Sequence, residues 1–184
     1  ALIELEDPAL LDYLQARAVE KRKAIFGTDV YIRGLIELSS YCRNDCYYCG
    51  LRRSNAQAER YRLLPEQILA CCKKGYELGF RTFVLQGGED TWFTEERIAD
   101  LISRIKVDWP DCALTLSLGE RSRKTYAAWR KAGADRYLLR HETANARHYG
   151  ILHPPELSFT NRRRCLYDLK ELGFQVGAGM MVGS

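Results

Sequence analysis

Short apolar segments alternate with longer segments of helical periodicity over most of the chain, and this order restricts the fold more than any other feature. The apolar segments have the length and composition of strands and span residues 31–39, 82–86, 113–118, 136–140 and 175–182. The helical segments between them span residues 65–78, 94–106, 122–132 and 159–172. Strands and helices in this order form right-handed βαβ units around a parallel sheet. The sequence therefore predicts an α/β protein.

Local signals indicate where the predicted helices begin and end. Pro65 stands at a first-turn position, where an amide proton is not needed, and Ser122 is a favourable N-cap. Gly79, Gly133 and Gly173 each follow a helical segment. Glycine at such a position can adopt the left-handed conformation that ends a helix.

The N-terminal segment differs from the alternating part. Residues 1–27 predict one amphipathic helix with charges throughout, and they lack the apolar region and cleavage site of a signal peptide. We expect a helical segment over residues 1–29 and a βα domain over residues 30–184. The chain begins at Ala1 and ends at Ser184 within a glycine-rich apolar stretch, so we expect it to be part of a longer gene product.

Composition and charge exclude several classes of protein. With 46% hydrophobic and 28% charged residues, the chain can bury a core and is not expected to be disordered. The net charge of +4 is spread along the sequence, which gives no support for nucleic-acid binding. No apolar run approaches the roughly 18 residues of a membrane span. Seven cysteines, an odd number in a chain too long to need disulfides, favour a reducing cytoplasm.

Three of the cysteines follow the first predicted strand. Cys42, Cys46 and Cys49 have the spacing C-x3-C-x2-C. Thiolates are the normal ligands of iron–sulfur clusters, and a cubane held by only three of them leaves one iron open to a small molecule. Zinc in structural sites usually has four protein ligands, and no fourth Cys or His lies near the triplet. We therefore favour a [4Fe-4S] cluster, with a non-enzymatic metal-binding scaffold as the alternative.

A polar or glycine-rich group follows every predicted strand. These groups are the cysteine triplet, Gln86–Glu89, Ser117–Glu120, Arg140–Asn145 and Gly177–Gly183. In a (β/α)8 barrel the active site lies at the carboxyl ends of all strands, whereas a doubly wound sheet binds its ligand at one switch point. The distribution favours a (β/α)8 TIM-type barrel. Because such a barrel needs roughly 200 to 250 residues, we expect this chain to cover about its first five strands.

The triplet, with the aromatic Tyr48 before its last cysteine, resembles the signature of the radical SAM superfamily. Other segments resemble the biotin synthase-like group of that superfamily, in particular CGLRR at 49–53, RYRL at 60–63, LQGGED at 85–90, TLSLGE at 115–120 and RYLLRHETAN at 136–145. Within the group the chain is most similar to [FeFe]-hydrogenase maturases, with methylornithine synthase as an alternative. Biotin synthase is less similar, because its second iron–sulfur cluster uses cysteines where this chain has Thr115 and Gly177.

The resemblance implies a function and a set of site residues. A [4Fe-4S] cluster on Cys42, Cys46 and Cys49 would reductively cleave S-adenosyl-L-methionine (SAM) to give a 5'-deoxyadenosyl radical, in the assembly of the hydrogenase diiron centre. The residues implied to line the SAM site are Tyr48, Gln86, Gly87, Gly88, Glu89, Ser117, Glu142 and Arg162. Arg140, His141 and Thr143 would face the substrate cavity.

The resemblance also implies partners. They are a small-molecule or small iron-complex substrate, reduced flavodoxin or ferredoxin as electron donor, and other hydrogenase maturases; neither nucleic acid nor a membrane is expected. Five arginines surround the triplet, at positions 43, 52, 53, 60 and 62. They are either a solvated face or the surface that meets an acidic electron donor.

Overall fold

The computed structural model describes residue 4 and residues 6–184, and the chain divides into two compact units, residues 1–32 and 33–184. The first unit contains helix α1 (Pro8–Phe26). Asp7 caps this helix by accepting a hydrogen bond from the Ala9 amide (2.9 Å). A helix is therefore present from Pro8 onward, as predicted, but its apolar residues do not gather on one face. Residues 1–3 and 5 lie outside the described residues. The division at residue 29 that the sequence suggests stays a prediction.

Within the described residues, the second unit is built on a five-stranded parallel sheet with the order β1-β2-β3-β4-β5. The strands are β1 (Gly34–Ser39), β2 (Thr82–Gly87), β3 (Ala113–Ser117), β4 (Arg136–Leu138) and β5 (Gln175–Gly177). The helices between them are α2 (Pro65–Glu77), α3 (Glu95–Asp108), α4 (Arg123–Ala132), α5 (Ala146–Leu152) and α6 (Phe159–Glu171). A doubly wound sheet reverses its strand order at a switch point, but this sheet does not. The predicted fold class, a partial (β/α)8 barrel, is confirmed.

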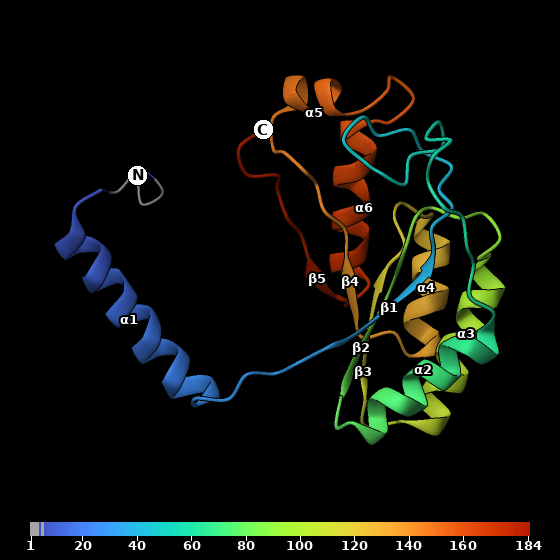
Figure 1. Ribbon diagram of the computed structural model, residues 1–184, viewed down its shortest axis with the longest axis horizontal. Coiled ribbons are helices and arrows are strands. Elements are labelled where there is room, and N and C mark those ends of the chain that lie inside the picture. Colours follow the sequence, from blue (N-terminus) through green and yellow to red (C-terminus); the bar gives the residue numbers. More distant parts are fainter. Residues whose placement is uncertain (1–3, 5) are drawn as a thin grey trace. The chain divides into compact units, whose positions relative to one another are not determined.

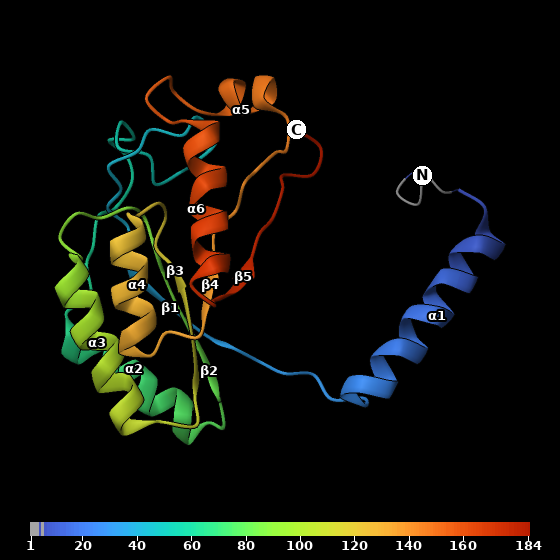
Figure 2. The ribbon, with the colours of Figure 1, turned by 180° about the vertical axis from the view of Figure 1, so that it is seen from behind.

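Helices α2, α3, α4 and α6 cover one face of the sheet (Figures 1 and 2). In β2 the side chains of Phe83 and Leu85 point toward these helices and are buried, whereas Val84 and Gln86 alternate with them and are half-buried. Burying a side chain such as Leu85 contributes about 2 kcal/mol. The hydrophobic core thus lies between the sheet and its helices, and the opposite face of the sheet corresponds to the interior of a barrel.

The predicted helix boundaries agree with the structure. The Ser122 hydroxyl accepts a hydrogen bond from the Thr125 amide (3.1 Å), as expected of an N-cap. Gly79, Gly133 and Gly173 all have a positive φ at the end of a helix. None of the helices that the structure describes is both long enough and apolar enough to cross a membrane.

Four strands are shorter than predicted, β3 by the single residue Leu118, and one helix was missed. β1 starts at Gly34 instead of Tyr31, β4 ends at Leu138, and β5 ends at Gly177 instead of Val182. Gly34 lies against Phe83, whose Cδ1 would be 2.9 Å from an added Cβ, so β1 begins where its backbone can approach β2. Helix α5 is short, and its N-cap Asn145 accepts a hydrogen bond from the His148 amide (3.1 Å).

Candidate functional site

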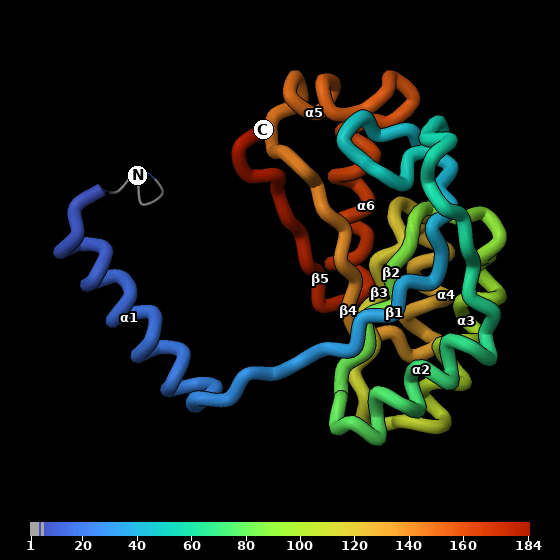
Figure 3. Tube along the Cα trace, in the orientation of Figure 1, coloured from blue at the N-terminus to red at the C-terminus, as the bar shows by residue number. Residues whose placement is uncertain are grey.

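The loop that carries the three cysteines, residues 40–63, lies at the carboxyl end of the sheet beside α5 (Figure 3). All three cysteines are free and half-buried. The Cys49 amide donates to the Cys46 carbonyl (3.0 Å), which closes a turn between the two residues. Burial raises the pKa of the Cys46 thiol to about 11, and burial also raises the pKa of Cys42. These thiols must lose a proton to bind a metal, so metal binding here should release protons.

Two arginines, Arg60 and Arg62, stabilise the cysteine loop through hydrogen bonds. Arg60 donates to the carbonyl oxygens of Ser40, Leu51 (3.0 Å) and Arg52 (2.7 Å). Arg62 forms an ion pair with the buried Asp90 through two hydrogen bonds of 2.7 and 2.9 Å. The side chains of Arg60 and Arg62 therefore stabilise the folded conformation of the loop. Asp90 balances the charge of Arg62, whereas Arg60 donates its N–H groups to neutral carbonyl oxygens.

The glycine pair after β2 packs against the cysteine loop. A Cβ on Gly88 would lie 2.3 Å from the Tyr41 carbonyl oxygen and 2.7 Å from Cys42 Cβ, so only glycine fits. The Glu89 amide donates to Cys42 Sγ (3.3 Å), and the Arg43 amide donates to the Glu89 carbonyl (3.1 Å). The first cysteine is thereby fixed to the end of β2.

The Glu89 side chain is buried, and its partners come from two segments. Its Oε2 accepts hydrogen bonds from Arg43 (3.0 and 2.8 Å), and its Oε1 accepts one from the Glu120 amide (2.7 Å). The carboxylate thus joins the cysteine loop to the segment after β3. If Glu89 also binds a ligand amine, its carboxylate must accept that hydrogen bond in addition to those from Arg43 and the Glu120 amide.

Arg162 on α6 is buried, and Glu120 is its ion-pair partner. The Nε atom of Arg162 donates to Glu120 Oε1 (2.5 Å), and Nη1 donates to the Arg140 carbonyl (2.8 Å). Burial alone would lower the pKa of Arg162, but Glu120, together with Tyr149 and Glu89, outweighs burial and the pKa is raised. The positive charge of Arg162 in turn favours the thiolate of Cys46, although burial dominates there. Glu120 was not among the predicted site residues, although it belongs to the polar group after the third strand.

Glu142 has an unusual backbone conformation. Its φ is 64°, in the left-handed region, and the residue is only 8% exposed. Two backbone hydrogen bonds hold it: its amide donates to Gly179 (3.0 Å), and its carbonyl accepts from Met181 (2.9 Å). The carboxylate makes no hydrogen bond or ion pair to any residue that the structure describes, but its charge contributes to the raised pKa of Tyr48, for which burial is the main cause. A strained residue with a free buried carboxylate is a candidate ligand-binding group.

Gln86 and Ser117 are neighbours in adjacent strands. Their Cα atoms are paired in the register of β2 and β3, and Gln86 Nε2 donates to Glu37 Oε1 on β1 (3.3 Å). Both residues belong to the set that alternates with the core-facing side chains. They therefore lie on the face that would form a barrel interior, near its carboxyl end, and their place in a SAM site stays a prediction.

Two of the predicted substrate residues lie beside α6. His141 and Thr143 line a cavity of about 480 Å³ together with Phe159, Arg163 and Tyr167 of that helix. Arg140 is exposed and its side chain passes Gly179. Arg140 therefore does not line this cavity, and a substrate role for the three residues stays a prediction.

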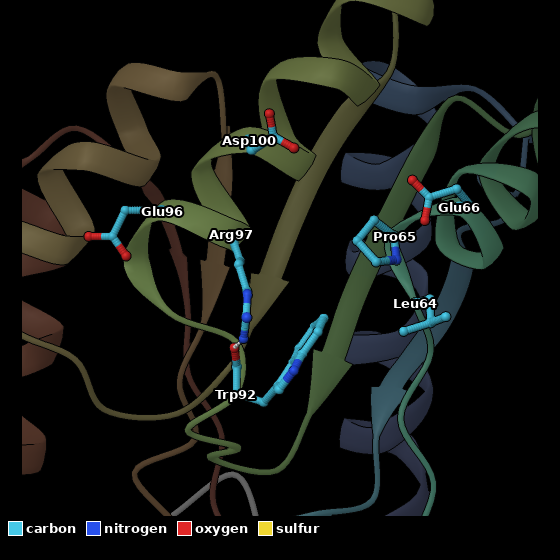
Figure 4. A pocket seen from close by; sticks show the side chains of 7 residues that line it. All are labelled: Leu64, Pro65, Glu66, Trp92, Glu96, Arg97 and Asp100. Carbon is cyan, nitrogen blue, oxygen red and sulfur yellow. Dashed lines mark hydrogen bonds between the residues drawn. The ribbon is translucent and has the colours of Figure 1, made fainter.

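A second groove lies away from these residues, between the N-terminal ends of α2 and α3 (Figure 4). Its volume is about 460 Å³. Arg97 donates to the Trp92 carbonyl (2.7 Å), and its guanidinium lies 4.1 Å from the centre of the Trp92 ring. The groove contains none of the predicted site residues.

The donor set at the cysteine loop fits an iron–sulfur cluster. Three thiols lie on one loop, which is held to the protein by Arg60, Arg62 and Gly88. In the part of the chain that the structure describes, no group of three Cys, His, Asp or Glu side chains is arranged to hold a single metal ion. The cysteines of a cubane bind separate irons, so their sulfurs need not converge on one point.

The chain is similar to several known proteins. The family model of the radical SAM superfamily matches residues 36–184. The chain is 46% identical to the [FeFe] hydrogenase maturase subunit HydE of Thermotoga maritima, over 98% of this chain and 51% of that protein. It is 31% identical to biotin synthase 2 of Frankia casuarinae, over 100% of this chain and 51% of that protein.

A solved structure shows the same fold. The crystal structure of methylornithine synthase (PylB) has a TM-score of 0.88 to this chain and is 30% identical to it, covering 99% of this chain and 54% of that one. The chain spans about half the length of the curated relatives that it matches.

Proposed function

Because the chain belongs to the radical SAM superfamily, we propose that Cys42, Cys46 and Cys49 hold a [4Fe-4S] cluster and that SAM binds beside it. The observation that carries the proposal is the cysteine loop itself: three half-buried free thiols, with Gly88 packed against Cys42. When bound, the cluster and SAM supply one-electron radical chemistry.

The residues around the loop bind and orient the ligands in this proposal. Arg162 is held by Glu120 and the Arg140 carbonyl, and its remaining N–H groups can pair with the ligand carboxylate. Glu142 presents a carboxylate that has no partner among the described residues, which suits a ligand hydroxyl or ammonium group. Tyr48, Gln86 and Ser117 would complete the walls of the SAM site.

We propose that the whole protein acts in the maturation of [FeFe]-hydrogenase. The support is the 46% identity to a HydE protein over nearly the whole of this chain. Methylornithine synthase is the second candidate, favoured by the TM-score of 0.88. The proposed substrate is a small molecule or small iron complex, and other hydrogenase maturases are the proposed partners.

A reduced flavodoxin or ferredoxin is the proposed electron donor, in the cytoplasm. Arg43 and Arg62 form ion pairs with Glu89 and Asp90, and Arg60 donates to carbonyl oxygens of the cysteine loop. The proposed surface for an acidic donor therefore consists of Arg52 and Arg53 on the same loop. Arg53 is exposed, and neither arginine forms an ion pair within 4 Å in the described structure. Their charges lie next to Cys49 in the sequence, where a donor would approach.

The test of the proposed function uses the full-length protein, reconstituted anaerobically with iron and sulfide. We expect about four irons per chain with acid-labile sulfide, and formation of 5'-deoxyadenosine from SAM after reduction. Cys46→Ala should abolish this product, whereas Cys71→Ala, an exposed cysteine on α2, should not. Zinc without sulfide, or full product from Cys46→Ala, would contradict the proposal.

A further inference from the structure

The side chain of His153 connects the cysteine loop to α5. This residue directly follows α5 and is 2% exposed. Its Nε2 atom lies 3.3 Å from the Tyr48 hydroxyl oxygen, and its Nδ1 atom lies 3.0 Å from the Tyr149 carbonyl oxygen. Both nitrogens of the buried imidazole therefore have a hydrogen-bond partner, and one partner, Tyr48, directly precedes Cys49.

The two contacts define the tautomer of the ring. A carbonyl oxygen can only accept a hydrogen bond, so Nδ1 of His153 carries a proton. In a neutral ring Nε2 is then the acceptor, and the Tyr48 hydroxyl donates to it. Burial lowers the pKa of His153, which favours the neutral ring. In the neutral ring the hydrogen bond therefore runs from Tyr48 to His153.

Ring contacts hold the histidine in place. The Tyr149 ring stacks on it, with centroids 3.9 Å apart and an angle of 18°, while the Tyr48 ring meets it edge-on at 5.4 Å and 85°. Tyr149 also contacts Phe159 of α6, at 5.5 Å. A chain of contacts therefore runs from α6 through Tyr149 and His153 to Tyr48.

A backbone hydrogen bond adds a second attachment at the same place. The Tyr47 amide donates to the carbonyl oxygen of Leu152, the last residue of α5 (3.0 Å). The segment between Cys46 and Cys49 is thus tied to α5 at two consecutive residues. One attachment depends on backbone atoms only, and the other can be removed by changing a side chain.

We propose that His153 is a positioning residue, which holds Tyr48 and the last turn of the cysteine loop in the conformation that binds SAM. The inference rests on the proposed function, because it assigns Tyr48 to the SAM site. His153 itself does not touch the reacting atoms and acts through the Tyr48 hydroxyl.

The test compares two substitutions of His153 in the full-length, anaerobically reconstituted protein. In His153→Gln the side-chain oxygen can reach the former Nε2 position and still accept from Tyr48, whereas the shorter His153→Asn can replace only Nδ1. We expect His153→Asn to raise the dissociation constant of SAM about fivefold, and His153→Gln to stay within about twofold of wild type. The perturbation of the reduced-cluster EPR signal by SAM should follow the same order.

Tyr48→Phe removes only the hydroxyl and is the second arm of the test. It should weaken SAM binding about as much as His153→Asn, and the double variant should be no worse than either single variant. Tyr47→Phe and His148→Asn are matched controls, because neither side chain contacts His153, and both should bind SAM like wild type.

Each outcome bears on one of the two proposals. A wild-type dissociation constant in Tyr48→Phe, or additive losses in the double variant, would overturn the positioning role. If His153→Asn fails to incorporate iron, His153→Gln and Tyr48→Phe still decide the question. A wild-type protein that contains the cluster but binds no SAM would instead contradict the proposed function.

Discussion

Arg162 Nε lies 2.5 Å from Glu120 Oε1, and both side chains are more than nine-tenths buried. Asn161, next to Arg162 on α6, donates to the other oxygen of Glu120. The Glu120 amide in turn donates to Glu89, which holds the cysteine loop through Arg43. One buried ion pair therefore links α6, the segment after β3 and the cysteine loop, and removing either charge leaves the other uncompensated.

Glu120→Gln should destabilise the protein and weaken SAM binding. The substitution removes the ion-pair partner of the buried Arg162, so we expect the free energy of unfolding to fall by about 3 kcal/mol, measured with urea on the apoprotein. Glu66→Gln is the control, because Glu66 pairs with Arg104 at 3.3 Å on the surface, and it should cost less than about 1 kcal/mol. Equal losses in the two variants would show that the burial of the pair has no effect.

Gly88→Ala should reduce iron incorporation. The new methyl group would stand 2.3 Å from the Tyr41 carbonyl oxygen, which is backbone and cannot rotate away, so the cysteine loop must shift. We expect less iron and sulfide per chain after reconstitution than in wild type. Gly150→Ala, where no atom lies within 4 Å of the added Cβ, should incorporate iron normally. Full iron content in Gly88→Ala would mean that the loop tolerates the shift.

Asp90→Asn should lose stability in a pH-dependent manner. Burial opposes ionisation of Asp90, but hydrogen bonds from Arg62, Ser39 and the Trp92 amide prevail, so its pKa is lowered from 3.8. The carboxylate therefore stabilises the folded protein above about pH 4, and this contribution disappears as the pH falls through the folded pKa. At pH 7 we expect a loss of about 2 kcal/mol in urea unfolding, shrinking below pH 4.

The control for that experiment is Asp111→Asn. Asp111 pairs with Arg81 at 3.0 Å, but both side chains are about half exposed, and the loss should stay below about 1 kcal/mol. A loss in Asp90→Asn that is the same at pH 7 and at pH 3 would contradict the role of the ionised carboxylate.

The strand pattern and helix ends could be predicted from the sequence because they depend on neighbouring residues. Phe83 and Leu85 alternate with less buried residues, and Gly133 stops α4, so these elements are visible locally. The ends of β1 and β5 were wrong for a different reason. Tyr31 and Val182 look like strand residues, but a strand ends where its partner ends, and pairing is not encoded locally.

The same distinction applies to the site. The spacing of the cysteines could be read directly, whereas Glu120 and His153 acquire their roles from partners 42 and 105 positions away, Arg162 and Tyr48. Helix α5 was missed because its seven residues have little apolar periodicity. Its packing depends on Tyr149 stacking on His153 and on the Tyr47 amide, contacts that form only after the chain has folded.

Substitutions of Glu142 should differ in stability but should weaken SAM binding alike. At φ 64° an L-residue with a side chain is strained, whereas glycine is not, so Glu142→Gly should be more stable than Glu142→Ala by about 1 kcal/mol in urea unfolding. Both variants lose the carboxylate, so both should bind SAM at least about tenfold more weakly than wild type. The pair separates backbone strain from ligand contact: wild-type affinity in Glu142→Ala would remove Glu142 from the site, and equal stabilities would show that the strain is absent. The positive φ and the buried carboxylate without a described partner are the two observations that make Glu142 a candidate binding residue.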